Sequence, residues 1–450
     1  MPRALLISTY DLGRQPFGLA SPAAWLRDAG VDVACADLAK EKLDPRRVHD
    51  ADVVAFFLPM HTATRLALPV IAQVRELNPS ARLVAYGLYA PLNATMLHEQ
   101  GVDHVLGGEF EEALVRVATG LGAPPSGEAG PRTSEIPRLH FRVPARDGLP
   151  PLTRYATLQV GAERRVAGST EASRGCKHRC RHCPVVPVYN GVFRVVPSDI
   201  VLADVRAQVA AGAQHITFGD PDFFNGVRHA QTIVEAFARE FPAVSYDVTI
   251  KVEHLLRHRW MLPRLRDTGC AFVTTAVESF DDGVLRRLEK GHTRADFERV
   301  VELAAAERLT LAPTFVPFTP WTTLAGYLDF LHTIDRLDLV EHVAPIQLAI
   351  RLLVPQGSRL LELPEMREVV THYDPHWLTH AWRHPDPRVD ALQREIEALV
   401  GVQLSRPRRD VFDRIWNVAH ERAEVAPRPR RQEGAMPRAT IPYLNEPWYC

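Results

Sequence analysis

The sequence predicts an α/β fold made of two parallel-sheet units, and three observations lead to that prediction. Short apolar runs alternate with segments of helical periodicity up to about residue 106. The same alternation returns between about residues 164 and 361, after a stretch rich in proline, glycine, serine and arginine. Beyond that point the pattern is mostly helical. Because alternating strands and helices form parallel sheets covered on both faces, we expect a Rossmann-like N-terminal sheet domain, a partial (β/α)6 barrel and a helical C-terminal extension.

The changes in composition place the domain boundaries. We expect the first α/β domain over 1–122, a linker over 123–153, the barrel over 154–361, the helical extension over 362–425 and a mobile tail over 426–450. The linker has no hydrophobic periodicity, which is typical of a segment without a core of its own. The apolar stripe of the extension, with Val389, Leu392 and Ile396 on one helix face, predicts a buttress or lid against the barrel.

Each element of the N-terminal domain follows from a local pattern. Its expected strands are Ala4–Ser8, Val31–Ala36, Asp52–Leu58, Arg82–Tyr86 and Val102–Leu106, and its expected helices are Ser21–Ala29, Thr64–Leu77 and Leu92–Gln100. Ser21 is the expected cap of the first helix, with Pro22 at the first helical position. Ligands of such sheets bind beyond the carboxyl ends of the strands, so the loops 9–13, 59–61 and 87–89 are candidate binding loops.

The barrel region repeats a strand followed by a helix. The expected strands are Arg164–Ala167, His215–Gly219, Ser245–Lys251, Ala271–Val277, Leu309–Val316 and Pro345–Leu353, and the expected helices are Pro197–Ala211, Val227–Glu240, His254–Asp267, Phe280–Leu288, Ala295–Glu307 and Leu324–Leu337. Active sites of such barrels lie at the carboxyl ends of the strands. Polar residues at those ends are therefore site candidates.

The composition narrows the class of protein. A net charge of −1 among 450 residues argues against nucleic acid as the main partner. The first residues contain too short an apolar run for a secretory signal, and no run approaches the length of a membrane span. Three of the six cysteines are clustered, which fits a reducing cytoplasm better than a disulfide framework. We expect a cytoplasmic protein with no membrane partner.

The most informative stretch is Arg174 to Pro184, in which Cys176, Cys180 and Cys183 have the spacing C-x3-C-x2-C. Thiolates are soft ligands, and three of them in a tight loop hold an iron–sulfur cluster or zinc. A cubane cluster has four irons, so three cysteines leave one iron open to an outside ligand. Zinc is the alternative occupant, with His178 or His182 as its fourth ligand. Zinc sites usually show two separated ligand pairs, and the sequence offers no second pair nearby.

This loop resembles that of the radical S-adenosylmethionine (SAM) superfamily, although His182 stands where an aromatic residue usually precedes the last cysteine. The resemblance implies a [4Fe-4S] cluster whose open iron chelates the amino and carboxylate groups of SAM. It also implies reductive cleavage of SAM to methionine and a 5′-deoxyadenosyl radical, with electrons from a donor such as flavodoxin or ferredoxin.

The same resemblance assigns the polar strand ends to SAM. The segment after the second strand contains Asp220 and Asp222, one of which is the candidate for the SAM ammonium, with a simple Asp-Pro turn as the alternative. Glu278 and Ser279 belong to a run that resembles the superfamily's E-S…L…K-G-x-T pattern, and they would face the SAM ribose and carboxylate. Lys290 and Thr293 of that run are expected to cap the following helix. Lys251 is a further SAM candidate, and a mere ion pair with Glu253 is the alternative.

The N-terminal domain resembles the cobalamin-binding-type domain that precedes many radical SAM barrels. No D-x-H-x-x-G follows its first strand, so the usual histidine ligand below cobalt has no counterpart. Some such domains bind cobalamin without that histidine and others are empty scaffolds, so the resemblance leaves cobalamin open. If it binds, we expect Tyr10, Gly13, His61 and Gly87 to contact the corrin, with His61 as a substitute ligand or a solvated loop residue.

The last residues, Glu446-Pro447-Trp448-Tyr449-Cys450, resemble the tail of the CUAEP/CCAEP-tail radical SAM (seleno)proteins. Those chains continue through a second cysteine or selenocysteine into Ala-Glu-Pro. We hypothesise that a UGA codon was read as a stop after Cys450, and that this cysteine belongs to a redox-active tail. An ordinary terminal residue is the alternative.

Together these patterns predict a radical SAM enzyme that functionalises an unactivated C–H bond. Methyl transfer is the expected outcome if cobalamin binds. Without cobalamin, we expect an oxidoreductase or a maturase of a peptide. A non-catalytic zinc- or cluster-binding regulator is the competing class, and the substrate does not follow from the residues.

Overall fold

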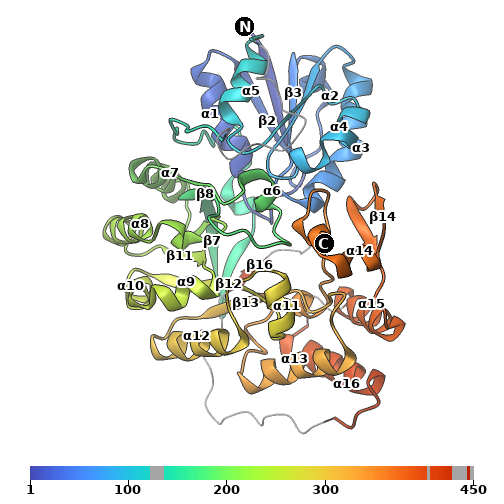
Figure 1. Cartoon of the computed structure of the whole chain (residues 1–450). Helices are drawn as coiled ribbons and strands as arrows, with labels where there is room; N and C mark the ends of the chain where they lie inside the picture. The colour runs from blue at the N-terminus through green and yellow to red at the C-terminus, as the bar shows by residue number, and fades with distance from the viewer. Residues whose placement is uncertain (122–135, 403–405, 428–442, 446–450) are drawn as a thin grey trace.

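The fold is taken from a computed structural model, which describes residues 1–121, 136–402, 406–427 and 443–445. In that part of the chain, a five-stranded parallel sheet is followed by a seven-stranded, mostly parallel sheet, with helices along their faces (Figure 1). No helix found there is both long and apolar enough to cross a lipid bilayer.

The N-terminal unit is a five-stranded parallel sheet in the order β2-β1-β3-β4-β5. Its strands are β1 (Arg3–Ser8), β2 (Asp32–Asp37), β3 (Val53–Phe57), β4 (Arg82–Tyr86) and β5 (His104–Leu106). Its helices are α1 (Phe17–Asp28), α2 (Pro45–His49), α3 (His61–Leu77), the 3₁₀ turn η1 (Pro91–Asn93), α4 (Ala94–Glu99) and α5 (Glu111–Ala118). This strand order is one of the two common doubly wound arrangements, and it places the binding loops beyond the carboxyl ends of β1, β3 and β4.

Helix α1 begins four residues earlier than the sequence predicts. Ser21 therefore lies inside the helix, and its hydroxyl donates to a carboxylate oxygen of Glu111 at 2.7 Å. The prediction that Ser21 caps this helix is wrong. Pro22 is the sixth residue of this helix and cannot donate to the carbonyl of Gly18, which instead accepts from the hydroxyl of Tyr86 at 2.8 Å.

The second unit is a curled seven-stranded sheet in the order β13-β12-β11-β10-β7-β6-β16. Its strands are β6 (Thr157–Val160), β7 (Glu163–Thr170), β10 (His215–Phe218), β11 (Ser245–Thr249), β12 (Cys270–Glu278), β13 (Leu311–Phe315) and β16 (Tyr443–Asn445). Strands β7 and β10 to β13 pair in parallel, whereas β6 and β16 pair antiparallel at one edge.

Helices cover the outer face of this sheet, as a partial barrel requires (Figure 1). They are α7 (Ser198–Ala210), η3 (Phe223–Gly226), α8 (Val227–Glu240), α9 (Val252–Arg257), η4 (Arg259–Met261), α10 (Leu262–Asp267), α11 (Asp282–Arg287), α12 (Arg294–Ala306) and α13 (Leu324–Arg336). A short hairpin of β8 (Ser173–Gly175) and β9 (Phe193–Val195) flanks α6 (Val185–Tyr189) beside the barrel mouth. The α/β class and the partial barrel are confirmed.

The sixth parallel strand is the exception. Residues Pro345–Leu348 form the 3₁₀ turn η5, and the β pairing that follows it is an isolated bridge between Phe318 and Arg351, outside the named strands. The strand predicted over Pro345–Leu353 is wrong. Pro345 has no N–H to donate to a ladder, and a short buried apolar run looks the same in a strand and in a turn.

The C-terminal part packs beside the barrel. It contains η6 (Arg359–Glu362), α14 (Pro364–Val369), the hairpin β14 (Val370–Asp374) and β15 (Thr379–Trp382), α15 (Pro387–Gly401) and α16 (Arg408–Arg422). Val389, Leu392 and Ile396 of α15 are buried in the barrel core, as a buttress requires. The hairpin was not predicted. The tail predicted to be mobile returns to the sheet as β16, and 428–442 and 446–450 lie outside the described residues.

Candidate functional site

The cysteine loop lies at the mouth of the barrel, between β8 and α6. The turn into it needs glycine at position 175, where φ is 72° and a Cβ would lie 2.5 Å from the carbonyl oxygen of Val192. Cys176 and Cys180 are buried and Cys183 is half-buried. Burial, together with the neighbouring thiols, raises the pKa of Cys183 to about 12. The bare thiol of Cys183 stays protonated, so binding of a metal or cluster there would release its proton.

Two buried lysine ammonium groups lie close to the thiols. The Nζ of Lys251 lies 3.7 Å from the Sγ of Cys180, and it comes from the end of β11. Lys290 is buried too, and its ammonium interacts first with the carboxylate of Glu278 and then with Cys180 and Cys183. On the side of Cys176, the Sγ lies 3.7 Å from Oδ1 of Asn225. A thiolate cluster carries net negative charge, so two buried ammonium groups beside it are the counter-charges that it needs.

The three thiols are not arranged as a ready site for a single ion. Tetrahedral zinc has Zn–S bonds of about 2.3 Å, which brings its sulfur ligands to within about 4 Å of one another. In the described part of the chain, the set of three ligand atoms within 4.8 Å of one another is His178, Asp222 and His254, without a cysteine. The wider spacing of the thiols fits a multi-iron cluster better than one zinc ion.

Glu278 lies at the end of β12, opposite the cysteine loop. Its backbone has φ 69°, and the register with β13 shifts between Ala276 and Glu278. Its Oε1 lies 3.1 Å from Nζ of Lys290 and 3.1 Å from Nε2 of His182. Burial alone would raise the pKa of Glu278, but Lys290 and His182 hold it well below its usual value. A non-glycine residue held at positive φ is uncommon and often marks a functional position.

Lys290 and Thr293 have different roles, although they were predicted to act together. Thr293 caps α12 through a capping box with Asp296, as expected. Lys290 is buried and pairs with Glu278, so the prediction that it caps the helix is wrong. A pattern of spacing places a lysine near a helix start but does not show the direction of its side chain.

The remaining predicted SAM residues line the same mouth. Both carboxylate oxygens of Asp220 are engaged, because Oδ1 accepts from the hydroxyl of Ser173 and Oδ2 from the N–H of Ala172. Asp222 begins η3, with Oδ1 accepting from the N–H of Phe224. Ser279 accepts from the N–H of Asp281. Lys251 lies 3.8 Å from Glu253, so the expected ion pair exists in addition to its contact with Cys180. Binding of SAM by these residues stays a prediction.

A cavity of about 240 Å³ opens where the two sheets meet. Its lining comes from loops at the carboxyl ends of β1, β3 and β4 on one side and from the ends of β7, β8 and β10 on the other. Representative lining residues are Asp11, Met60, Gly87, Leu88 and Gly175. The cavity therefore lies at the edge where α/β sheets bind their ligands, and it reaches the start of the cysteine loop.

Of the residues predicted to contact a corrin, Gly87 lines this cavity directly. Tyr10 is buried and precedes Asp11, a residue that lines the cavity. Gly13 is not among the lining residues, and its carbonyl accepts from the N–H of Ala156. His61 points elsewhere, since its Nε2 contacts the carbonyl oxygen of Trp377. No histidine occurs among the lining residues of this cavity in the described part of the chain. Cys450 lies outside the described residues, and its redox role stays a prediction.

A buried arginine joins the two units next to the cavity. Arg174, the residue two before Cys176, lies 3.0 Å from Glu109 and 2.7 Å from Glu111 of the N-terminal unit. It also lies 2.9 Å from Glu171. The sequence analysis did not single out Arg174. Two features of the sequence could have indicated this role. Arg174 is a charged residue just before the cysteines, and the segment Gly-Gly-Glu-Phe-Glu at 107–111 supplies two of its partners.

Residues 170–329, from the end of β7 to within α13, match the Radical SAM superfamily. The matched segment includes the cysteine loop and the ends of β10 to β13. The chain contains a radical SAM domain.

One sequence relative matches more of the chain than that domain. Hopanoid C-3 methylase of Methylococcus capsulatus is 26% identical over 339 residues, covering 71% of this chain and 64% of the methylase. A tRNA-2-methylthio-N(6)-dimethylallyladenosine synthase of Sorangium cellulosum is 29% identical over 145 residues, or 28% of this chain and 29% of the synthase. The chain thus spans less than two thirds of the length of both relatives.

Solved structures share the whole arrangement of the radical SAM domain and the preceding sheet. The cobalamin-dependent S-adenosylmethionine radical enzyme OxsB, with aqua-cobalamin and S-adenosylmethionine bound, matches 94% of this chain and 72% of its own with a TM-score of 0.70 and 15% identity. The radical S-adenosylmethionine methyltransferase TsrM from Kitasatospora setae matches 88% of this chain and 89% of its own, with a TM-score of 0.64 and 17% identity. At these identities the likeness establishes the fold.

Proposed function

We propose that this protein is a cobalamin-dependent radical SAM methyltransferase, in which Cys176, Cys180 and Cys183 hold a [4Fe-4S] cluster. The observation that carries the proposal is the position of the cysteine loop. Its three thiols lie at the barrel mouth and its first residues line the cavity between the two sheets. A group held in the loop and a group held in the cavity would therefore face one another.

The thiol loop suits a cluster because its donors are soft and two buried cations lie beside them. Lys251 and Lys290 offset the negative charge of the thiolates. When bound, the cluster supplies the electron that cleaves SAM, while the protein orients SAM and keeps water away. We assign the charged groups of SAM to Lys251, Glu278 and Ser279, which come from the ends of β11 and β12.

The cavity suits a flat apolar group with polar edges. Phe57, Phe110 and Leu88 give it apolar walls, and Arg14 adds hydrogen-bond donors. If a corrin binds here, the described lining would offer its cobalt no histidine as a ligand. When bound, cobalamin supplies a carrier for the methyl group. The chain's part is to hold the corrin against the SAM site.

The names of the relatives favour methyl transfer over other radical reactions. Hopanoid C-3 methylase and TsrM are both described as methyl-transferring enzymes, and OxsB is described as cobalamin-dependent. The methylthiotransferase-type relatives match 28–36% of the chain and carry less weight. The acceptor of the methyl group is a carbon or phosphorus centre that stays to be identified.

Product analysis tests this function. The protein, loaded with cluster and cobalamin under anaerobic conditions, is reduced and given SAM, and the products are separated by mass spectrometry. We expect 5′-deoxyadenosine with methionine whenever the cluster is present, and S-adenosylhomocysteine only when cobalamin is present as well. Deoxyadenosine without a cobalamin-dependent product would indicate a cobalamin-free radical enzyme. The absence of both 5′-deoxyadenosine and S-adenosylhomocysteine would overturn the proposal.

A further inference from the structure

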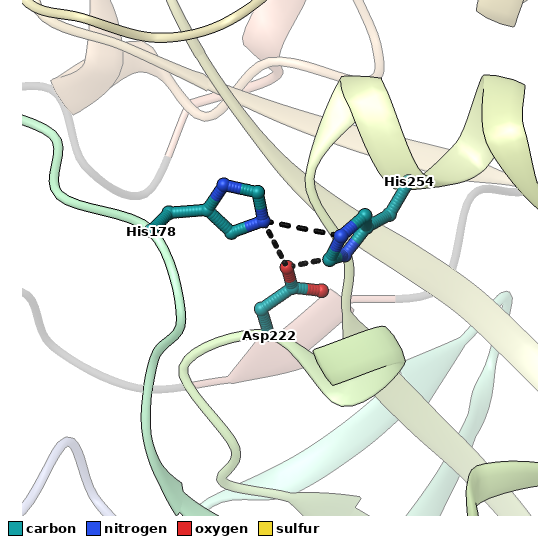
Figure 2. Close-up of side chains that lie close together, drawn as sticks. All are labelled: His178, Asp222 and His254. Carbon is teal, nitrogen blue, oxygen red and sulfur yellow. Dashed lines mark hydrogen bonds and ion pairs between the residues drawn. The ribbon is translucent and has the colours of Figure 1, made fainter. Parts of the chain in front are cut away.

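Three side chains that are distant in sequence converge beside the cysteine loop: His178, Asp222 and His254 (Figure 2). Nε2 of His178 lies 3.1 Å from Nε2 of His254 and 3.8 Å from Oδ2 of Asp222. Nδ1 of His254 lies 2.6 Å from the same Oδ2. One ligand atom from each of the three residues therefore lies within 4.8 Å of the other two.

Two of these atoms are enclosed and make no hydrogen bond. The side chains of Asp222 and His254 are fully buried. Although they approach closely, the geometry between Oδ2 of Asp222 and Nδ1 of His254 is not that of a hydrogen bond, and both atoms are unsatisfied in the described structure. Buried polar atoms are nearly always paired, because leaving one unpaired costs about 1–3 kcal/mol. A bound cation would satisfy both.

The surroundings hold the three ligands in place from three separate segments. His178 lies in the loop between Cys176 and Cys180, Asp222 follows β10, and His254 belongs to α9 after β11. The second oxygen of Asp222, Oδ1, is fixed by the N–H of Phe224, which leaves Oδ2 turned toward the histidines (Figure 2).

The His178 ring has its own orienting partner. Its Nδ1 faces away from Asp222 (Figure 2) and lies 3.6 Å from Oε2 of Glu253. A carboxylate beside the outer nitrogen of a metal-bound histidine is a common arrangement, because it fixes the ring and makes the inner nitrogen a better ligand. His178 is also the partly exposed member of the group, with 17% of its side chain accessible, so the group can be reached from solvent.

We propose that His178, Asp222 and His254 bind a single divalent transition-metal ion, Zn²⁺ or Fe²⁺, at a site that uses none of the three cysteine thiols. Two imidazoles and one carboxylate suit ions of this borderline softness, and three protein ligands leave a position open for water or another ligand. The ion joins the cysteine loop to the ends of β10 and β11. Asp222 is then a ligand of the ion, and Lys251, Glu278 and Ser279 are the residues that bind the charged groups of SAM.

Zinc K-edge absorption spectroscopy tests this site, because it observes zinc alone and is blind to iron. The full-length chain is reconstituted anaerobically with iron and sulfide, supplied with one equivalent of Zn²⁺ and passed over a chelating resin. We expect about one zinc per chain, with nitrogen and oxygen ligands at about 2.0–2.2 Å and no sulfur at about 2.3 Å. Loss of zinc to the resin, or sulfur ligands in its first shell, would overturn the proposal.

Variants connect the signal to the three residues. His254→Gln and Asp222→Asn are each expected to weaken zinc binding roughly tenfold or more, since either change removes a ligand. His258→Gln is the matched control, because the His258 ring lies 5.7 Å from that of His254 but outside the ligand set. Circular dichroism and iron content are measured on all variants. Zinc affinity that is equal in the ligand and control variants would contradict the site, and the wild-type spectrum decides the matter if a variant does not fold.

Discussion

The ammonium of Lys290 lies 3.1 Å from Oε1 of Glu278, and both side chains are buried at the mouth of the barrel. Each charge depends on the other, because an unpaired charge in such a place is strongly unfavourable. The pair also lies between the cysteine loop, through His182, and the end of β12. The residue predicted to bind SAM is thus held in position by a lysine that the sequence analysis assigned to a helix end.

Variants of this pair distinguish the contribution of Glu278 to protein stability from its contribution to SAM binding. Glu278→Gln leaves Lys290 unpaired and is expected to lower the free energy of unfolding by about 3–5 kcal/mol. The double variant Glu278→Gln with Lys290→Met is expected to recover most of that stability and still bind SAM at least tenfold more weakly. Urea denaturation of the cluster-free protein and calorimetric SAM titration of the loaded protein measure the two effects. Glu289→Gln, a change in a partly exposed ion pair, is the control. Full SAM affinity in the double variant would remove Glu278 from the site.

Arg174 is expected to join the two units. Arg174→Met leaves Glu109 and Glu111 buried without their cation, so we expect a loss of about 3–5 kcal/mol in the free energy of unfolding. Arg165→Met is a matched control, because Arg165 pairs with the exposed Glu163 and such pairs contribute less than about 1 kcal/mol. Urea denaturation of both variants gives the comparison. Equal losses in the two variants would show that the buried cluster does not stabilise the junction.

Asp220 gives the protein a pH dependence of known sign. Burial raises its pKa to about 6, against the hydrogen bonds from Ser173 and Ala172 that lower it. Between about pH 4 and pH 6 the folded state keeps a proton that the unfolded state has lost, so the free energy of unfolding falls as pH rises. The loss approaches about 3 kcal/mol above pH 6.

Asp220→Asn removes this titration and should flatten the profile between pH 4 and pH 6. Urea denaturation of the cluster-free protein at half-unit intervals of pH measures it. Asp199→Asn, at the exposed start of α7, serves as the control and is expected to leave the slope unchanged. A slope that persists in Asp220→Asn would assign the pH dependence to other groups.

Cobalamin binding depends on the cavity between the sheets. Leu88→Trp fills part of that cavity and is expected to abolish retention of cobalamin after gel filtration, whereas Leu66→Trp, on an exposed position of α3, should not. In the wild-type complex, the electron paramagnetic resonance spectrum of the Co(II) form should lack nitrogen superhyperfine splitting, because no histidine is among the described residues that line the cavity. Retention by Leu88→Trp, or splitting from a nitrogen ligand, would contradict the placement.

The parts of the site that depend on residues close together in the chain could be predicted from the sequence. The cysteine loop, the polar ends of β10 to β12 and the binding edge of the first sheet follow from spacing and periodicity. Long-range relationships did not follow. His178 and His254 are 76 residues apart and meet only because the loop folds over the end of β11. Ser21 was mistaken for a cap because its partner, Glu111, lies 90 residues away.

The central claim is that Cys176, Cys180 and Cys183 hold a four-iron cluster with one iron open to SAM. The most direct measurement is the electron paramagnetic resonance spectrum of the anaerobically reconstituted, dithionite-reduced protein, before and after addition of SAM. We predict the signal of a reduced [4Fe-4S] cluster that shifts on addition of SAM, and its loss when all three cysteines are changed to alanine. A signal that survives in the triple variant, or a wild-type cluster that does not respond to SAM, would contradict the account.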